Sequence, residues 1–199
     1  LVANGAVEMN GRTANDFTSY WMSLPKNRFE LWARLIADGL HSAIFRRFYS
    51  EVEYVKDERR IKIENDPVGL LYEEFLKAAY QVHPYGRTGF GTMETINKFT
   101  ARAAKAFWHA YYRPNNAVLA VAGDIDPEET IAVVEKYFGV LEPGELNRLE
   151  IHDEPPQQGE RRIVVTFDAE PLIRIGYHKP TYPTRDAYVL DVISAILSS

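Results

Sequence analysis

The chain has 199 residues, of which 46% are hydrophobic and 26% charged, proportions that are typical of a globular protein. Its net charge is -5 with both signs mixed along the chain, so it lacks the basic excess of a nucleic-acid-binding surface, and no apolar run approaches the roughly 20 residues that cross a bilayer. The absence of cysteine excludes disulfides, cysteine nucleophiles and thiolate zinc sites, and it fits a cytosolic and a periplasmic protein equally well.

The first third of the chain predicts a hairpin followed by helices. Residues 5–12 and 16–24 are rich in strand formers and are separated by a short turn, so they predict two adjacent strands. Residues 27–44 carry apolar side chains at helical spacing, with Asn27 as the expected N-cap. Residues 45–64 predict a second helix, and residues 66–80 a third that opens with an Asp-Pro pair.

The middle of the chain alternates loop, helix and strand signals. Residues 83–92 contain four Gly or Pro residues and predict a loop. A helix is expected from about Thr100 to Tyr112, and the unbroken apolar run at residues 117–123 predicts a fully buried strand. A further helix follows, with Asp126 as its N-cap and Gly139 as its C-cap.

The last third begins with a polar segment that is rich in Pro and Gly. Residues 142–160 predict a linker, residues 161–168 and 172–178 two strands, and residues from about Thr184 a terminal helix. We therefore expect an α+β fold with helices on a mainly antiparallel sheet, a first domain over residues 1–141, and the beginning of a second over residues 161–199. The chain starts at Leu1 and stops within a helical pattern, so it is expected to be a piece of a longer polypeptide.

Two glutamates on the helix predicted at residues 45–64 are candidates for chemistry. Glu51 and Glu58 are seven residues apart, which places them on one helix face two turns from each other, at the border of an apolar stripe. A carboxylate there needs a cation, a hydrogen-bond donor or a metal. From geometry alone a structural salt bridge, with Arg59 or Lys62 nearby, is the more common explanation.

The histidines do not form a metal site by themselves. The chain has five, and no two are three or four residues apart. A protease-type zinc site needs three protein ligands and an open position for water, and this chain alone shows no such set.

Several stretches together resemble the pitrilysin/insulinase peptidases, the M16 or inverzincin family that includes the mitochondrial processing peptidase. EVEYVKDERRIKIENDP resembles the segment that carries that family's third zinc ligand. GAVEMNGRTANDFTSYWMSLP resembles its strand pair, HPYGRTGFGTMETINKFT its HPYGRP loop, and AFWHAYYRPNNAVLAVAGDIDPEETIAVVEKYFG its next helix, central strand and following helix. The four matches occur in the family's order between about Gly5 and Gly139.

The resemblance implies a processing-peptidase-like fold, shared with the metalloenzyme LuxS, that closes like a clamshell on peptides and hydrolyses them with zinc. In that family an HxxEH motif supplies two histidine ligands and a general base, and a distant glutamate is the third ligand. Glu58 matches that glutamate, and Glu51 matches an acidic residue that supports the site. Asn10 matches a strand residue that contacts the substrate backbone, and Gly11 stands where alanine is usual. The HxxEH motif itself is absent, and the family places it upstream of residues 1–199.

Two other functions remain open at this point. A non-catalytic family subunit or scaffold that partners an active peptidase would share the same motifs. Whichever holds, a homodimer or heterodimer with a family member stays open. A plain α+β binding module would leave the four ordered matches unexplained. The residues do not separate a periplasmic or cytoplasmic location in a bacterium from a mitochondrial matrix.

Overall fold

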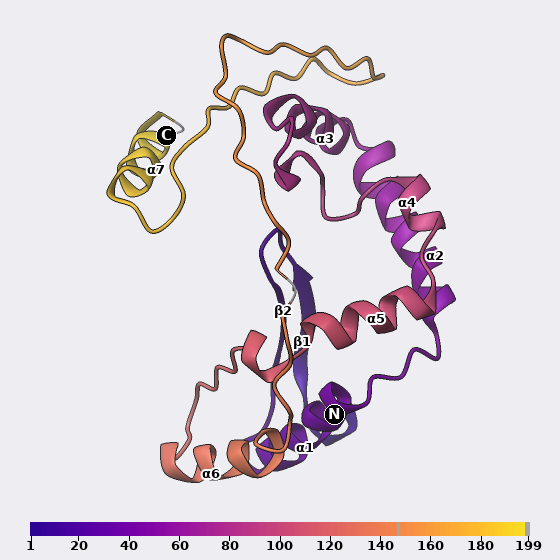
Figure 1. Cartoon of the computed structure of the whole chain (residues 1–199), viewed down its shortest axis with the longest axis vertical. Coiled ribbons are helices and arrows are strands. Elements are labelled where there is room, and N and C mark those ends of the chain that lie inside the picture. Colours follow the sequence, from indigo (N-terminus) through magenta and orange to yellow (C-terminus); the bar gives the residue numbers. More distant parts are fainter. Residues whose placement is uncertain (147, 198–199) are drawn as a thin grey trace. The chain divides into compact units, whose positions relative to one another are not determined.

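The computed structural model describes residues 1–146 and 148–197, which form two compact units (Figure 1). The first unit comprises residues 1–60 and 89–151, and the second comprises residues 61–88 and those from 152 onward. Both units are therefore built from two separate stretches of sequence. The chain enters the second unit immediately after the helix that carries Glu51 and Glu58.

An antiparallel hairpin opens the first unit, as predicted. Strand β1 (Val7–Thr13) pairs with β2 (Thr18–Ser23), and Asn10 lies opposite Trp21 while Gly11 lies opposite Tyr20. A β-bulge interrupts the register between Val7 and Asn10. Bulges bend a strand and change the direction of its side chains, and they are common beside functional sites.

Helices α1 (Phe29–His41) and α6 (Pro127–Phe138) pack together in the first unit (Figure 1). The ring of Trp32 on α1 lies against that of Phe138 on α6, with centroids 6.1 Å apart. The expected N-cap role of Asn27 is wrong, because residues 26–28 form a 3-10 turn and α1 starts after Arg28 without a side-chain cap. Asp126 does cap α6, accepting a 2.9 Å hydrogen bond from the Glu129 amide.

The helix predicted at residues 45–64 divides into two parts. Helix α2 spans Phe48–Arg59, and a π-helical turn continues it over Arg60–Glu64. Helices α4 (Met93–Asn97) and α5 (Ala101–Tyr111) follow the loop, with N-caps from Thr92 and Thr100. Short 3-10 turns occupy Val2–Asn4, Pro84–Gly86 and Pro114–Asn116.

The second unit contains helices α3 (Pro67–Ala79) and α7 (Arg185–Leu197). The Asp66 side chain caps α3 by accepting hydrogen bonds from the amides of Val68 at 3.4 Å and Gly69 at 2.9 Å. Gly69 is required here, since a Cβ at this position would lie 1.9 Å from the carbonyl oxygen of Lys62. Both predicted helices are thus confirmed.

Three strand predictions are wrong for the structure described. Residues 117–123, 161–168 and 172–178 form no strand, and Val118 and Ile175 are 97% and 76% exposed. An apolar segment becomes a buried strand only when neighbouring strands satisfy its backbone, and β1 and β2 form the sole ladder within residues 1–146 and 148–197. The class is nevertheless α+β, with helices and a small antiparallel sheet. Over the same residues no helix has the length and apolar character needed to span a bilayer.

Candidate functional site

Helix α2 carries both predicted glutamates on its solvent-facing side. Glu51 lies in the first turn and Glu58 near the last residue, and both are exposed. The residues that follow each of them, Val52 and Arg59, are the two buried residues of the helix. The glutamates therefore form a line along the border of the buried face, as their spacing predicts, and their side chains remain accessible to a ligand.

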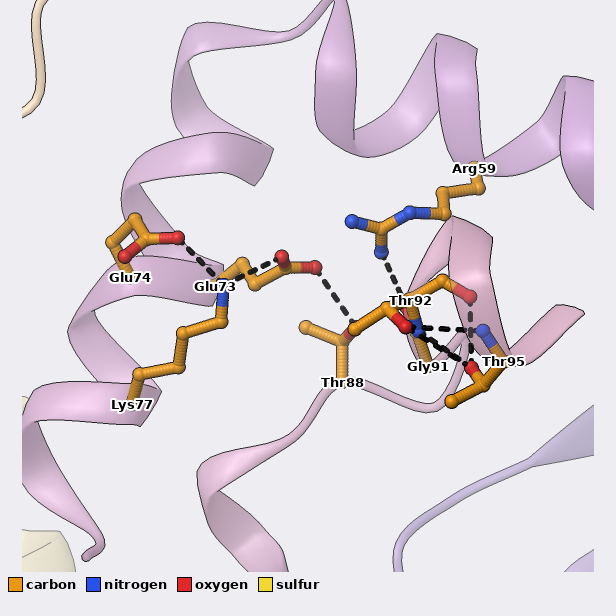
Figure 2. A network of polar contacts seen from close by, with 8 residues as sticks. All are labelled: Arg59, Glu73, Glu74, Lys77, Thr88, Gly91, Thr92 and Thr95. Atoms are coloured by element: carbon orange, nitrogen blue, oxygen red, sulfur yellow. Dashed lines mark hydrogen bonds and ion pairs between the residues drawn. The ribbon is translucent and has the colours of Figure 1, made fainter.

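The last turn of α2 is fixed by its buried arginine. Arg59 donates a 2.5 Å hydrogen bond to the carbonyl oxygen of Gly91, in the loop before α4 (Figure 2). Next to it Thr92 and Thr95 form a reciprocal capping box, and Ile96 of α4 is fully buried. Because Glu58 immediately precedes Arg59, these contacts also fix where the Glu58 carboxylate leaves the helix.

The two glutamates suit different roles. Seven residues correspond to about 10.5 Å along a helix axis, so the two carboxylates start far apart. Within the part of the chain that the structure describes, no three His, Asp or Glu side chains gather closely enough to hold a metal ion. A carboxylate is a common zinc ligand, so these residues fit a zinc ion by contributing one ligand, with the others coming from elsewhere.

The predicted substrate strand is an exposed edge. Every residue of β1 is exposed, and in the residues described it pairs with β2 on one side only. The Asn10 side-chain oxygen accepts a 2.8 Å hydrogen bond from the Gly11 amide. The backbone on the other edge is therefore available to pair with an extended peptide.

Gly11 has a packing role that its sequence did not reveal. A Cβ here would lie 3.0 Å from the ring of Tyr20 on β2, so a larger residue would require this ring to move by a few tenths of an ångström. The Tyr20 hydroxyl forms a 2.7 Å hydrogen bond with that of Tyr112, whose ring stacks on Trp108 at 3.7 Å. Desolvation and this hydrogen bond raise the pKa of Tyr20, so its hydroxyl stays protonated.

The second unit contains a buried carboxylate that the sequence analysis missed. Glu73 of α3 is 5% exposed and accepts hydrogen bonds from Lys77 at 3.0 Å and from the Thr88 hydroxyl at 3.3 Å (Figure 2). Desolvation lowers the pKa of Lys77, but its bonds to Glu74 and Glu73 outweigh this and raise it. The apolar neighbours of Glu73 at helical spacing were the available signal, since they put it on the buried face.

The predicted linker is attached to the second unit by a second carboxylate, which is partly buried. Glu154 accepts hydrogen bonds from the amides of Gln81, Val82 and His83 at 2.6, 2.9 and 2.9 Å. Desolvation raises the pKa of Glu154. The three hydrogen bonds and the charge of Arg161 have the larger, opposite effect and lower the pKa to about 2. Arg161 in turn donates to the last carbonyls of α3, so residues 154–161 close the C-terminal end of that helix.

Comparison with known proteins gives the family of the chain. The family described as "Peptidase M16 inactive domain" matches residues 98–199, slightly more than half of the chain. The chain belongs to the M16 peptidase family. The zinc protease PqqE of Helicobacter pylori is 31% identical over 194 residues, which cover 94% of this chain and 44% of that protein. The probable mitochondrial-processing peptidase subunit beta of Schizosaccharomyces pombe is 28% identical over 141 residues, 70% of this chain and 31% of that one.

Solved structures confirm the processing-peptidase-like M16 fold. A protease from Helicobacter pylori superposes with a TM-score of 0.71 at 31% identity, over 80% of this chain and 39% of that one. The first half of the periplasmic protease PqqL from Escherichia coli gives a TM-score of 0.66 at 19% identity, over 75% and 33%. The M16 chain described here spans less than half the length of these relatives.

Proposed function

We propose that this M16 chain is part of a zinc metalloendopeptidase that hydrolyses peptides or small unfolded proteins inside a clamshell chamber. The observation that carries the proposal is the pair Glu51 and Glu58, exposed on one face of α2, in a chain whose relatives include zinc proteases. The seven-residue spacing alone would also suit a structural carboxylate. The resemblance of Glu58 and Glu51 to the family's ligand and its supporting acid favours the metal site.

Each residue has a role in this proposal. Glu58 holds the zinc as one of its ligands, and two histidines of an HxxEH motif outside residues 1–199 are the others. Glu51, two turns away, supplies negative charge and hydrogen-bond acceptors that orient the groups around the site. Zinc, when bound, supplies Lewis-acid activation of water at neutral pH. The edge of β1 at Asn10 and Gly11 binds the peptide backbone, which gives affinity with little dependence on sequence.

A second function has its own support. The matched family is described as an inactive domain, and one relative is a subunit of a mitochondrial processing peptidase. The chain would then belong to a non-catalytic subunit or scaffold that partners an active peptidase in a heterodimer. This alternative differs from the first in one measurable property, since a non-catalytic subunit needs no bound zinc.

The test is the Glu58→Gln substitution in the longer protein that contains this chain. The amide is a poor zinc ligand, so we expect loss of bound zinc and at least about 100-fold loss of peptide cleavage. The two measurements are metal content by mass spectrometry and turnover of a fluorogenic peptide.

Two further variants make this result specific. Glu53→Gln, an exposed glutamate on the same helix, is the matched control and should keep both zinc and activity. Glu51→Gln should keep most of the zinc and lose part of the activity. Unchanged zinc content in Glu58→Gln would refute the ligand assignment, and a parent protein that holds no zinc would favour the non-catalytic subunit.

A further inference from the structure

The two faces of the β1–β2 hairpin have different surroundings. Because side chains alternate along a strand, Gly11 and Tyr20 share one face, while Asn10, Arg12 and Trp21 share the other. The Tyr20 face lies against the end of α5 through the hydroxyl bond to Tyr112. The opposite face, which carries Arg12, points away from that aromatic contact.

Arg12 is an exposed cation that the fold does not use. Within residues 1–146 and 148–197 its side chain forms no hydrogen bond, ion pair or cation–π contact, which is also true of Arg28, Arg46, Arg47 and Arg102 of the first unit. Of these arginines, Arg12 is the one that lies on β1. Its cross-strand partner is the neutral Ser19. The nearest acid on the same strand, Glu8, is four residues away and accepts a 2.9 Å hydrogen bond from the Ser23 hydroxyl. The positive charge of Arg12 is thus left for a group outside the hairpin.

A peptide that pairs with the free edge of β1 would place one side chain beside Arg12. Residues directly opposite each other on neighbouring antiparallel strands have their Cβ atoms about 4.5–5.5 Å apart on the same face. A glutamate or aspartate at that peptide position could form a bidentate pair with the guanidinium, whereas a lysine would be repelled. Backbone pairing fixes the register, so the effect concerns one position of the peptide.

We propose that Arg12 is a specificity-determining residue that selects an acidic side chain in the peptide bound along β1. The proposal rests on the proposed function, because it assumes that a peptide binds at this edge. It adds the substrate class, extended peptides with an acidic residue at one fixed position relative to Asn10. Asn10 and Gly11 contact the backbone of the peptide, and Arg12 forms an ion pair with its acidic side chain.

The experiment uses the longer zinc-loaded protein and sets of peptides that differ by Glu, Gln or Lys at one position. We expect the parent to prefer Glu over Gln at a single position by roughly 2- to 5-fold in kcat/KM, which is the range of an exposed ion pair. Arg12→Gln should remove this preference, and Arg12→Glu should reverse it in favour of Lys. Raising the salt concentration should weaken the preference because exposed charges are screened.

Arg102→Gln and Arg102→Glu are the matched controls. Arg102 is exposed on α5 in the same unit, so these variants change the net charge equally without touching β1. They should keep the parent's preference. A Glu-to-Gln ratio that is the same in the parent and in both Arg12 variants would overturn the proposal.

A binding assay separates this proposal from the proposed function. The affinities of the Glu, Gln and Lys peptides are measured by fluorescence anisotropy with the parent and with Arg12→Glu, whether or not cleavage occurs. An Arg12-dependent preference in binding without any cleavage would sustain the selectivity and refute the peptidase. Cleavage of all peptides without any Arg12-dependent preference would sustain the peptidase and refute the selectivity. A protein that neither binds nor cleaves these peptides would refute both.

Discussion

Glu58 and Arg59 are neighbours in sequence and have opposite environments. The arginine is 6% exposed and bound to a backbone carbonyl, while the glutamate is exposed on the adjoining face of α2. The bond from the buried Arg59 guanidinium to the Gly91 carbonyl joins the last turn of α2 to the loop before α4, although the Arg59 Nε itself has no hydrogen-bond partner among the described residues. The Glu58 carboxylate therefore lies on a turn that a neighbouring contact fixes, a position that suits the proposed metal ligand.

Glu154 gives a prediction for the pH dependence of the second unit. Its pKa falls from the ordinary 4.5 to about 2 in the folded state, so its stabilising effect is fully present above 4.5. That effect is lost as the pH falls from 4.5 towards 2, because the unfolded carboxylate takes up its proton first. We expect Glu154→Gln to be less stable than the parent at neutral pH and the difference to shrink over this window.

The measurement for Glu154 is thermal unfolding of the parent and the variant at pH values between 2 and 7. The quantity that matters is the difference between the two curves, since other carboxylates titrate in the same range. Glu160→Gln, an exposed glutamate of the same segment, is the control and should follow the parent. A Glu154→Gln variant whose difference from the parent is constant over the whole range would contradict the assignment.

At the scale of single elements, the N-cap of α3 gives a prediction for stability. Replacing Asp66 with Ala removes the acceptor for the Val68 and Gly69 amides at the start of the helix. We expect the free energy of unfolding to fall by about 1 kcal/mol, the usual cost of losing such a cap. Asp168→Ala, an exposed position in the same unit, should change it by less than about 0.5 kcal/mol. Chemical denaturation with equal m-values for the variants tests this, and equal stability of the two would exclude the capping role.

The elements that the sequence predicted well are those with local causes. Asp66 and Asp126, each before a proline, mark the starts of α3 and α6 because the bonds they accept lie within three residues. The π-helical turn after α2 leaves no comparable local signal, since it spans only Arg60–Glu64 and no cap or proline marks its start. The apolar runs near Val118 and Ile175 were predicted as strands from composition, but strand formation depends on partners that composition does not reveal.

At the scale of the whole molecule, part of the candidate site follows from local sequence patterns and part depends on residues that are far apart in the chain. The alignment of Glu51 with Glu58 is a helical periodicity and could be predicted from spacing alone. The packing of Tyr20 over Gly11 joins two strands with Tyr112, about ninety residues away, and no local pattern encodes it. The family resemblance indicated the roles of Glu51 and Glu58 in zinc binding and of Asn10 and Gly11 in peptide binding. These roles are still predictions.

The whole molecule also gives the sharpest prediction about the extent of the catalytic unit. Residues 1–146 and 148–197 contain no trio of metal-binding side chains, and one carboxylate cannot hold zinc against water. A polypeptide of residues 1–199 should therefore bind no zinc at micromolar concentration and cleave no peptide. The longer protein with an HxxEH segment should do both. The measurement is zinc content and turnover of one fluorogenic peptide for the two polypeptides at equal concentration. Peptide cleavage by the shorter polypeptide that disappears in Glu58→Gln would place the complete catalytic centre within these residues, against the argument made from the ligands.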